Sequence, residues 1–221
     1  MLKLKLIAAT LVALSLSVSA ATIMVQGTIA GQTNVNGATG YIVNQDAVNA
    51  GNIADVKTGE RFILVGQGVA ASQTNVNTAN GYIVDQDGLN IGNQATVKGK
   101  RSGLVVVGQA ALVSQTNLNT ETGTTVKLTQ DGTNVGNTAA VKGGNVVTIQ
   151  LVGASQRNVN KGGAKIVKQN GTNIGNSATV RARDNSLTVQ GAAVSQRNVN
   201  TGRGYKVTQT GTNVGNTATI R

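Results

Sequence analysis

The sequence predicts an all-β fold, a β-solenoid of five stacked rungs with about 40 residues in each rung. Three observations predict it. One unit recurs five times along the chain, and its side chains alternate with a period of two, which is typical of strands. The chain contains no Pro, which fits a backbone whose N–H groups all donate to neighbouring strands. A single unit cannot bury its own apolar face, so the copies must stack.

Residues 1–20 have the pattern of a secretory signal peptide. Lys3 and Lys5 precede a mostly apolar stretch from Leu6 to Leu16, and Val18–Ala20 is a small-residue cleavage pattern. A transmembrane anchor is the alternative, but the apolar stretch is short for a span and no stop-transfer charge follows it. We therefore expect a secreted chain without membrane insertion, in which residues 21–221 form the solenoid.

The five units are placed at residues 23–62, 63–103, 104–145, 146–186 and 187–221. The first half of a unit reads Gln-x4-Ser-Gln-x-Asn-x-Asn, as from Gln67 to Asn77. The second half reads Gln-x-Gly-x-Asn-x-Gly-Asn-x-Ala-x-Val, as from Gln86 to Val97. Loops tolerate changes in length and stacked strands do not, so the stretches of variable length are expected to be turns. These are Thr58–Arg61, Lys98–Gly103, Gly143–Asn145 and Ala182–Ser186 between units, and Thr78–Gly81 with its counterparts within units.

The alternation changes its parity within the second half of each unit. In the second unit Val84 and Gln86 share one face, whereas Asn93, Ala95 and Val97 have the opposite parity. Such a change requires a bend or bulge. The segment Asp87–Gly92 is therefore expected to be an arc between two strands, which gives about four short strands per unit. The long period and the parity change favour one broad rung per unit.

Seven columns of Gln or Asn recur in every unit and are the candidate functional residues. An amide carries both a donor and an acceptor, so identical amides stacked in register can form hydrogen-bonded ladders. The first three columns are Gln26, Gln67, Gln109, Gln150 and Gln190; Gln32, Gln73, Gln115, Gln156 and Gln196; and Asn34, Asn75, Asn117, Asn158 and Asn198. The other four are Asn36, Asn77, Asn119, Asn160 and Asn200; Gln45, Gln86, Gln130, Gln169 and Gln209; Asn49, Asn90, Asn134, Asn173 and Asn213; and Asn52, Asn93, Asn137, Asn176 and Asn216.

Composition argues against several classes of function. The chain has no His and no Cys, so the usual catalytic bases and nucleophiles are missing, and an enzyme is not expected. The units lack the regularly spaced aspartates of calcium-binding repeats, so no metal or other cofactor is expected. The net charge is +11, but only four residues are aromatic, and no nucleic-acid-binding motif occurs. Nucleic acid is therefore not expected as the primary partner.

The ends of the repeat array point to self-assembly. The first unit begins close to the predicted cleavage site, and the fifth unit ends beside Arg221 without an atypical capping unit. Solenoids normally need polar caps, and an uncapped edge is a template for another chain. The expected partner is therefore another copy of the chain, stacked head-to-tail so that cross-β stacking continues between subunits.

The repeat resembles a known family of fibre subunits. Asn-x-Ala-x-Val preceded by Gln-x-Gly, as from Gln86 to Val97, resembles the curlin repeat of curli subunits, which are secreted bacterial functional amyloids. Curlin units are shorter, near half this length, and the interval from Gln86 to Asn93 is longer by two residues. The unit is closer in size to the repeats of Fap fibre subunits, but it lacks their Cys-x-x-Cys motif. The curlin resemblance favours two narrow rungs per unit, so the number of rungs stays open.

The resemblance also implies a biological setting. It implies export of an unfolded chain by a dedicated secretion system, assembly outside the cell started by a nucleator, and a role in biofilm matrix and adhesion. The alternative is a soluble, monomeric β-solenoid that acts as an adhesin or binds ice or another surface. Thr133, Thr172 and Thr212 share a column that would suit such a surface, although Val48 and Leu89 occupy it in the first two units. Fibre formation by the purified chain separates the two readings.

Overall fold

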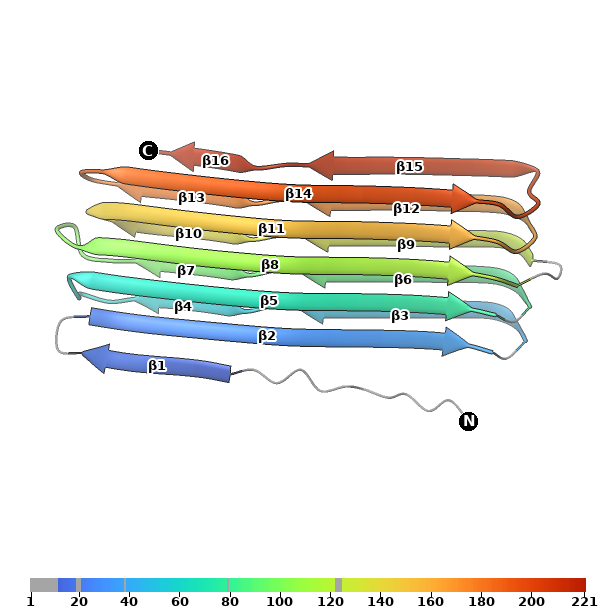
Figure 1. The fold of residues 1–221 in the computed structure, drawn as a ribbon, viewed down its shortest axis with the longest axis horizontal. Helices are drawn as coiled ribbons and strands as arrows, with labels where there is room; N and C mark the ends of the chain where they lie inside the picture. Colours follow the sequence, from blue (N-terminus) through green and yellow to red (C-terminus); the bar gives the residue numbers. More distant parts are fainter. Residues whose placement is uncertain (1–11, 19–20, 38, 79, 122–124) are drawn as a thin grey trace.

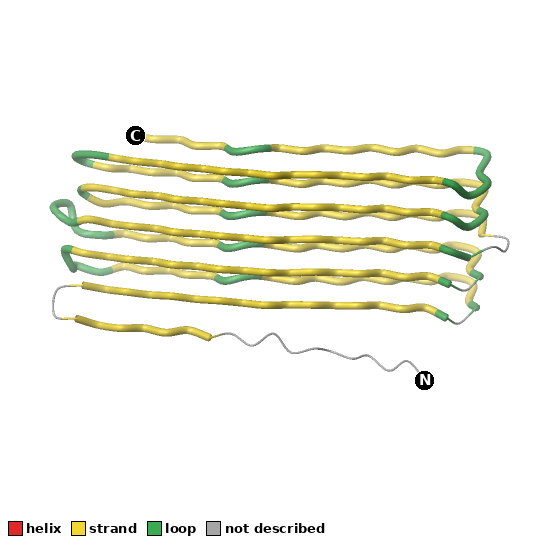
Figure 2. The backbone as a smooth tube through the Cα atoms, in the orientation of Figure 1, coloured by secondary structure: helices red, strands yellow, loops and turns green. Residues whose placement is uncertain are grey.

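The computed structural model describes residues 12–18, 21–37, 39–78, 80–121 and 125–221. Within these residues the regular secondary structure consists of strands β1 to β16, so the predicted all-β class is confirmed. The strands lie in two layers, with one long strand of each repeat in front of two shorter strands (Figure 1). The chain passes from one layer to the other through short turns at both ends of the molecule (Figure 2).

Each repeat contributes one long, one middle and one short strand, and we call these three strands a rung. The long strands are β2 (Ala21–Asn36), β5 (Phe62–Asn77), β8 (Leu104–Asn119), β11 (Asn145–Asn160) and β14 (Ser186–Asn200). The middle strands are β3 (Gly40–Ala50), β6 (Gly81–Ile91), β9 (Thr125–Val135), β12 (Ala164–Ile174) and β15 (Lys206–Val214). The short strands are β4 (Ile53–Lys57), β7 (Gln94–Lys98), β10 (Thr138–Gly143), β13 (Ser177–Ala182) and β16 (Thr217–Ile220).

Equivalent strands of successive rungs pair in parallel and in register. In the long-strand sheet, for example, Gln67 is paired with Gln109 on one side and with Gln26 on the other. The middle strands and the short strands each form a five-stranded parallel sheet in the order of the repeats. The fold is therefore a β-solenoid of five rungs with one broad rung per repeat. The expectation of four strands per unit was wrong, because each rung has three.

The change of parity is real, but the bend is shorter than the predicted arc. Residues Gly81–Ile91 form one continuous strand, and the chain bends only at Gly92 and Asn93 before β7 begins. A Cβ atom on Gly92 would lie 2.6 Å from the carbonyl oxygen of Gly136, the equivalent glycine of the next rung. This close approach of backbones requires glycine in the column Gly51, Gly92, Gly136 and Gly175.

The interior contains three separate apolar cores, with amide side chains between them. The first core lies between the short strands and the start of the long strands, and includes Val97 and Val105. The second lies along the middle of the long strands, around Val69 and Val113. The third, around Val84 and Leu128, lies at the turns between long and middle strands. These residues alternate with outward-facing ones along each strand, as the period of two predicts.

The leader region is described only in part. Residues Val12–Val18 form β1, which pairs antiparallel with Ala21–Gly27 at the N-terminal edge of β2. Residues 1–11 and 19–20 lie outside the described part of the chain, so the signal peptide stays a prediction. Among the described residues, no helix is long and apolar enough to cross a membrane.

Candidate functional site: the amide ladders

Six of the seven amide columns form side-chain ladders that run through all five rungs. In the column of Asn93, each side chain donates its Nδ2 to the Oδ1 of the next asparagine, at 2.8 to 2.9 Å. In the column of Gln86, each Nε2 donates to the Oε1 of the previous glutamine, at 2.7 to 2.8 Å. The columns of Gln67, Asn75, Asn77 and Asn90 form equivalent bonds. The structure therefore brings the residues of these six columns together along the stack.

Each ladder has a direction along the stack. In both glutamine ladders the donated bond points to the preceding rung, whereas in the four asparagine ladders it points to the following rung. Backbone carbonyls, which can only accept, fix this orientation. The Nε2 of Gln67 also donates to the carbonyl of Gln94 at 3.1 Å, and the Nδ2 of Asn93 donates to that of Ala110 at 2.7 Å. The stack is therefore polar, and its two ends present different groups.

The amides also join each rung to the next through the backbone. Asn90 donates to the carbonyl of Ser114, and Gln86 donates to the carbonyl of Leu118, both in the following rung. The same pattern recurs one rung later, where Asn134 donates to the carbonyl of Ser155. Asn93, Asn90 and Gln86 have no exposed surface, so these bonds form away from water. A buried amide that loses its partners is costly, so this interior is specific for a rung of the same sequence.

The seventh column differs from the prediction. Gln115, Gln156 and Gln196 donate across their own rung, to the carbonyls of Asp131, Asn170 and Thr210. The Oε1 atoms of Gln73, Gln115, Gln156 and Gln196 are buried without a hydrogen-bond partner among the described residues. These glutamines therefore connect the two layers of a rung and do not form a ladder.

Glycine on the opposite strand explains the different arrangement of this column. A Cβ atom on Gly132 would lie 2.5 Å from the Oε1 of Gln115 and would collide with the Nε2 of Gln156. The glutamine side chains occupy the space that a Cβ would fill, and there they reach the carbonyl that precedes the glycine. The Gly that recurs two residues after Gln in each repeat is thus explained by this contact. In the first rung Ala47 takes its place. Gln73 of the second rung donates to the Ala47 carbonyl at 2.9 Å as well as to that of Asp87 at 3.3 Å, so it also joins the first two rungs.

The edge of the fifth rung is exposed. Every residue from Lys206 to Arg221 is exposed, whereas Val167 and Val180, which have the same positions in the fourth rung, have no exposed surface. Gln209 and Asn213 already bond to the fourth rung through Gln169 and Asn173. Another rung stacked here would meet amides in the same columns as those at the internal junctions.

Three aspartates stack on the outer face of the middle strands. Asp46 is paired with Asp87, and Asp87 with Asp131. The pKa of Asp87 is raised from 3.8 to about 6, and the largest cause is desolvation by its neighbours. The charges of Asp131, Asp46 and Asp85, in that order, contribute the rest of this increase.

A tyrosine pair was missed at the level of sequence. The rings of Tyr41 and Tyr82 stack with centroids 4.8 Å apart and an interplanar angle of 6°. They occupy the same repeat position, four residues before Gln45 and Gln86. Aligning the five repeats beneath one another would have shown this column, which also contains Tyr205.

No protein-family model, curated protein or solved structure matches the chain.

Proposed function

We propose that the chain is a secreted structural subunit that polymerises head-to-tail into extracellular amyloid-like fibres. The observation that supports this most directly is the set of six amide ladders, which keep the same spacing and direction from the first rung to the fifth. The first rung of another copy would continue the two glutamine and four asparagine ladders without any change of register.

The internal junctions specify the bonds expected at this junction. Asn173 donates to the carbonyl of Ser195 in the following rung, so Asn213 would donate to the carbonyl of Gly31 in the next copy. Likewise, Asn176 donates to the carbonyl of Gly191, so Asn216 would donate to that of Gly27 in the next copy. The parallel sheets would continue across the junction at the usual strand spacing of about 4.8 Å. This is the geometry of a cross-β fibre.

The resemblance of the repeats to curlin supports a role for such fibres in biofilm matrix and surface adhesion. It also supports the involvement of a nucleator and a dedicated secretion system. The buried amide columns suit a fibre subunit, because they select identical neighbours more strongly than an apolar core would.

The test is assembly of the purified chain beginning at Ala21. At micromolar concentration in neutral buffer it is expected to form fibres with 4.7–4.8 Å cross-β diffraction, the spacing of stacked strands. A chain that stays monomeric for days under these conditions would contradict the proposal and support a soluble solenoid adhesin instead.

A matched pair of variants locates the contact. Asn213→Lys with Asn216→Lys places two charges on the inward face of the exposed rung and is expected to stop elongation, because an inward charge blocks an edge. Thr208→Lys with Thr210→Lys adds the same charge to the outward face of β15 and is expected to elongate. Equal elongation by the two variants would show that rung five is not the growing surface.

A further inference from the structure

All three tyrosines of the chain lie in one column of the solenoid. From the first rung to the fifth, the column reads Tyr41, Tyr82, Val126, Lys165 and Tyr205. The register supports this alignment, because Ile42 is paired with Ile83, Ile83 with Lys127, Lys127 with Ile166, and Ile166 with Lys206. The tyrosines are therefore absent from the middle of the stack and occupy the two rungs at one end and the single rung at the other.

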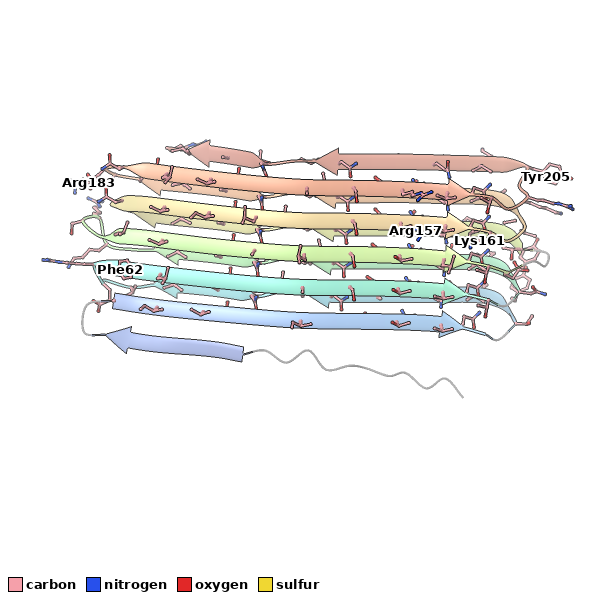
Figure 3. The ribbon with its side chains drawn as sticks, in the orientation of Figure 1. Phe62, Arg157, Lys161, Arg183 and Tyr205 are labelled. Carbon is pink, nitrogen blue, oxygen red and sulfur yellow. The ribbon has the colours of Figure 1, made fainter. Side chains whose placement is uncertain are left out.

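These two ends are the ones that would meet in a head-to-tail polymer. The side chain of Tyr205 is 93% exposed, and that of Tyr41 is 69% exposed although one face of its ring is covered by Tyr82. Tyr205 projects at the end of the molecule where the chain turns from β14 to β15 (Figure 3). The backbone N–H of Tyr205 donates to the carbonyl of Lys165 at 3.0 Å, which keeps Tyr205 within its column.

We infer that the subunit junction is closed by a stack of three tyrosines, in which Tyr205 of one copy packs on Tyr41 of the next, and Tyr41 packs on Tyr82. This inference rests on the proposed function. The rings of Tyr41 and Tyr82 show the geometry expected at this junction, because they belong to adjacent rungs of the same column and stack with their centroids 4.8 Å apart. A fifth rung followed by a first rung places Tyr205 and Tyr41 in the same relation.

The distribution of charge favours the same order of rungs. The fifth unit carries Arg197, Arg203, Lys206 and Arg221 and no acidic residue. The first unit, in contrast, carries Asp46, Asp55 and Glu60 against Lys57 and Arg61. Rungs about 4.8 Å apart lie within the screening length of about 8 Å at physiological ionic strength, so this difference acts across the junction. A contact between fifth and first rungs is therefore less repulsive than one between two fifth rungs.

The test uses subunits that each keep one tyrosine. One subunit, Tyr41→Phe with Tyr82→Phe, keeps Tyr205; the other, Tyr82→Phe with Tyr205→Phe, keeps Tyr41. Phenylalanine preserves the stacking of the rings but cannot form dityrosine. Fibres are grown from each subunit alone and from an equal mixture, and are then photo-oxidised with a ruthenium sensitiser and persulfate. Covalent dimers are expected from the mixture and not from either subunit alone.

The outcomes separate this inference from the proposed function. Fibres of the mixture without covalent dimers would overturn the tyrosine stack and leave polymerisation standing. Dimers from the subunit that keeps only Tyr205 would show contacts between fifth rungs and would overturn the order of rungs. If no fibres form from the unmodified chain, both proposals fail. As a second measurement, Tyr205→Ala is expected to raise the critical concentration about 2- to 10-fold, the range for losing one aromatic pair, whereas Tyr205→Phe leaves it within about 2-fold.

Discussion

Replacement of a single ladder asparagine, Asn93→Ala, is expected to lower the free energy of unfolding by about 2–4 kcal/mol. Asn93 has no exposed surface. Its Nδ2 donates to the carbonyl of Ala110 at 2.7 Å and to the Oδ1 of Asn137 at 2.8 Å, and its Oδ1 accepts a hydrogen bond from Asn52 at 2.9 Å. Each of these bonds contributes roughly 0.5–1.5 kcal/mol net, and alanine replaces none of them.

Two further substitutions compare the contribution of a ladder amide to the free energy of unfolding with those of an amide outside the ladders and of an exposed amide. Gln73→Ala removes bonds to the carbonyls of Ala47 and Asp87, at 2.9 and 3.3 Å, together with a buried Oε1 that has no described partner. Its expected cost is smaller, about 1 kcal/mol, because the lost bonds are offset by removal of the unpaired oxygen. Asn44→Ala, on the exposed face of β3, makes the same chemical change as Asn93→Ala outside the interior. It is expected to cost no more than about 0.5 kcal/mol.

The assay is guanidinium unfolding of the monomer at submicromolar concentration, followed by circular dichroism, with the three variants measured together. The argument requires the order Asn93→Ala, then Gln73→Ala, then Asn44→Ala, from the largest loss to the smallest. If Asn93→Ala and Asn44→Ala differ by less than the error of the measurement, the ladders do not stabilise the stack.

Three other results are expected. Gly132→Ala should lower the free energy of unfolding by about 1–3 kcal/mol, because its Cβ collides with buried glutamines. The control is Gly108→Ala, whose Cβ would meet nothing nearer than 4.0 Å, and it should be neutral or stabilising in the same unfolding assay. The pKa of Asp87 is raised from 3.8 to about 6. Between these two values the folded chain holds a proton that the unfolded chain releases, so the free energy of unfolding should fall as the pH rises from 3.8 to about 6. A pH titration of the midpoint should be flatter for Asp87→Asn, and an unchanged slope would exclude Asp87 as its source. Finally, fibres grown from seeds should elongate more slowly with a chain that retains residues 1–20 than with one that begins at Ala21, because β1 covers the edge of β2. Equal rates of elongation would show that β1 does not protect this edge.

Internal repetition made most of the fold predictable from the sequence. Residues that recur at the same position in every copy had to lie above one another, so the columns of Asn93 and Gln86 could be assigned without knowing the shape of a rung. The parity change between Gln86 and Asn93 was also correctly interpreted as a bend. The length of this bend could not be predicted. A recurring glycine gives the same sequence pattern whether it allows close contact between the backbones of successive rungs or forms part of a longer arc.

The direction of an amide side chain was beyond sequence reasoning. Gln73 and Gln67 are the same residue type with the same periodicity. Gln73, however, donates to backbone carbonyls of the middle strands, those of Ala47 and Asp87, whereas Gln67 donates to the side chain of Gln26 along the stack. The difference lies in what faces each of them in the opposite layer. Gln73 faces the glycine column that includes Gly88, whereas Gln67 lies near the carbonyl of Gln94. This facing relation depends on how the two layers align, and no local pattern encodes that alignment.

One rung per repeat sets how much protein a given length of fibre would contain. Five rungs advance the stack by only about 24 Å, at about 4.8 Å for each rung. The full chain of 22.4 kDa, and the slightly lighter chain that begins at Ala21, would then give a filament on the order of 9 kDa per nanometre, twice the linear density expected if each repeat folded into two narrow rungs. Filaments built in this way would be shorter and heavier per unit length for the same number of subunits, and scanning transmission electron microscopy would measure this linear density directly.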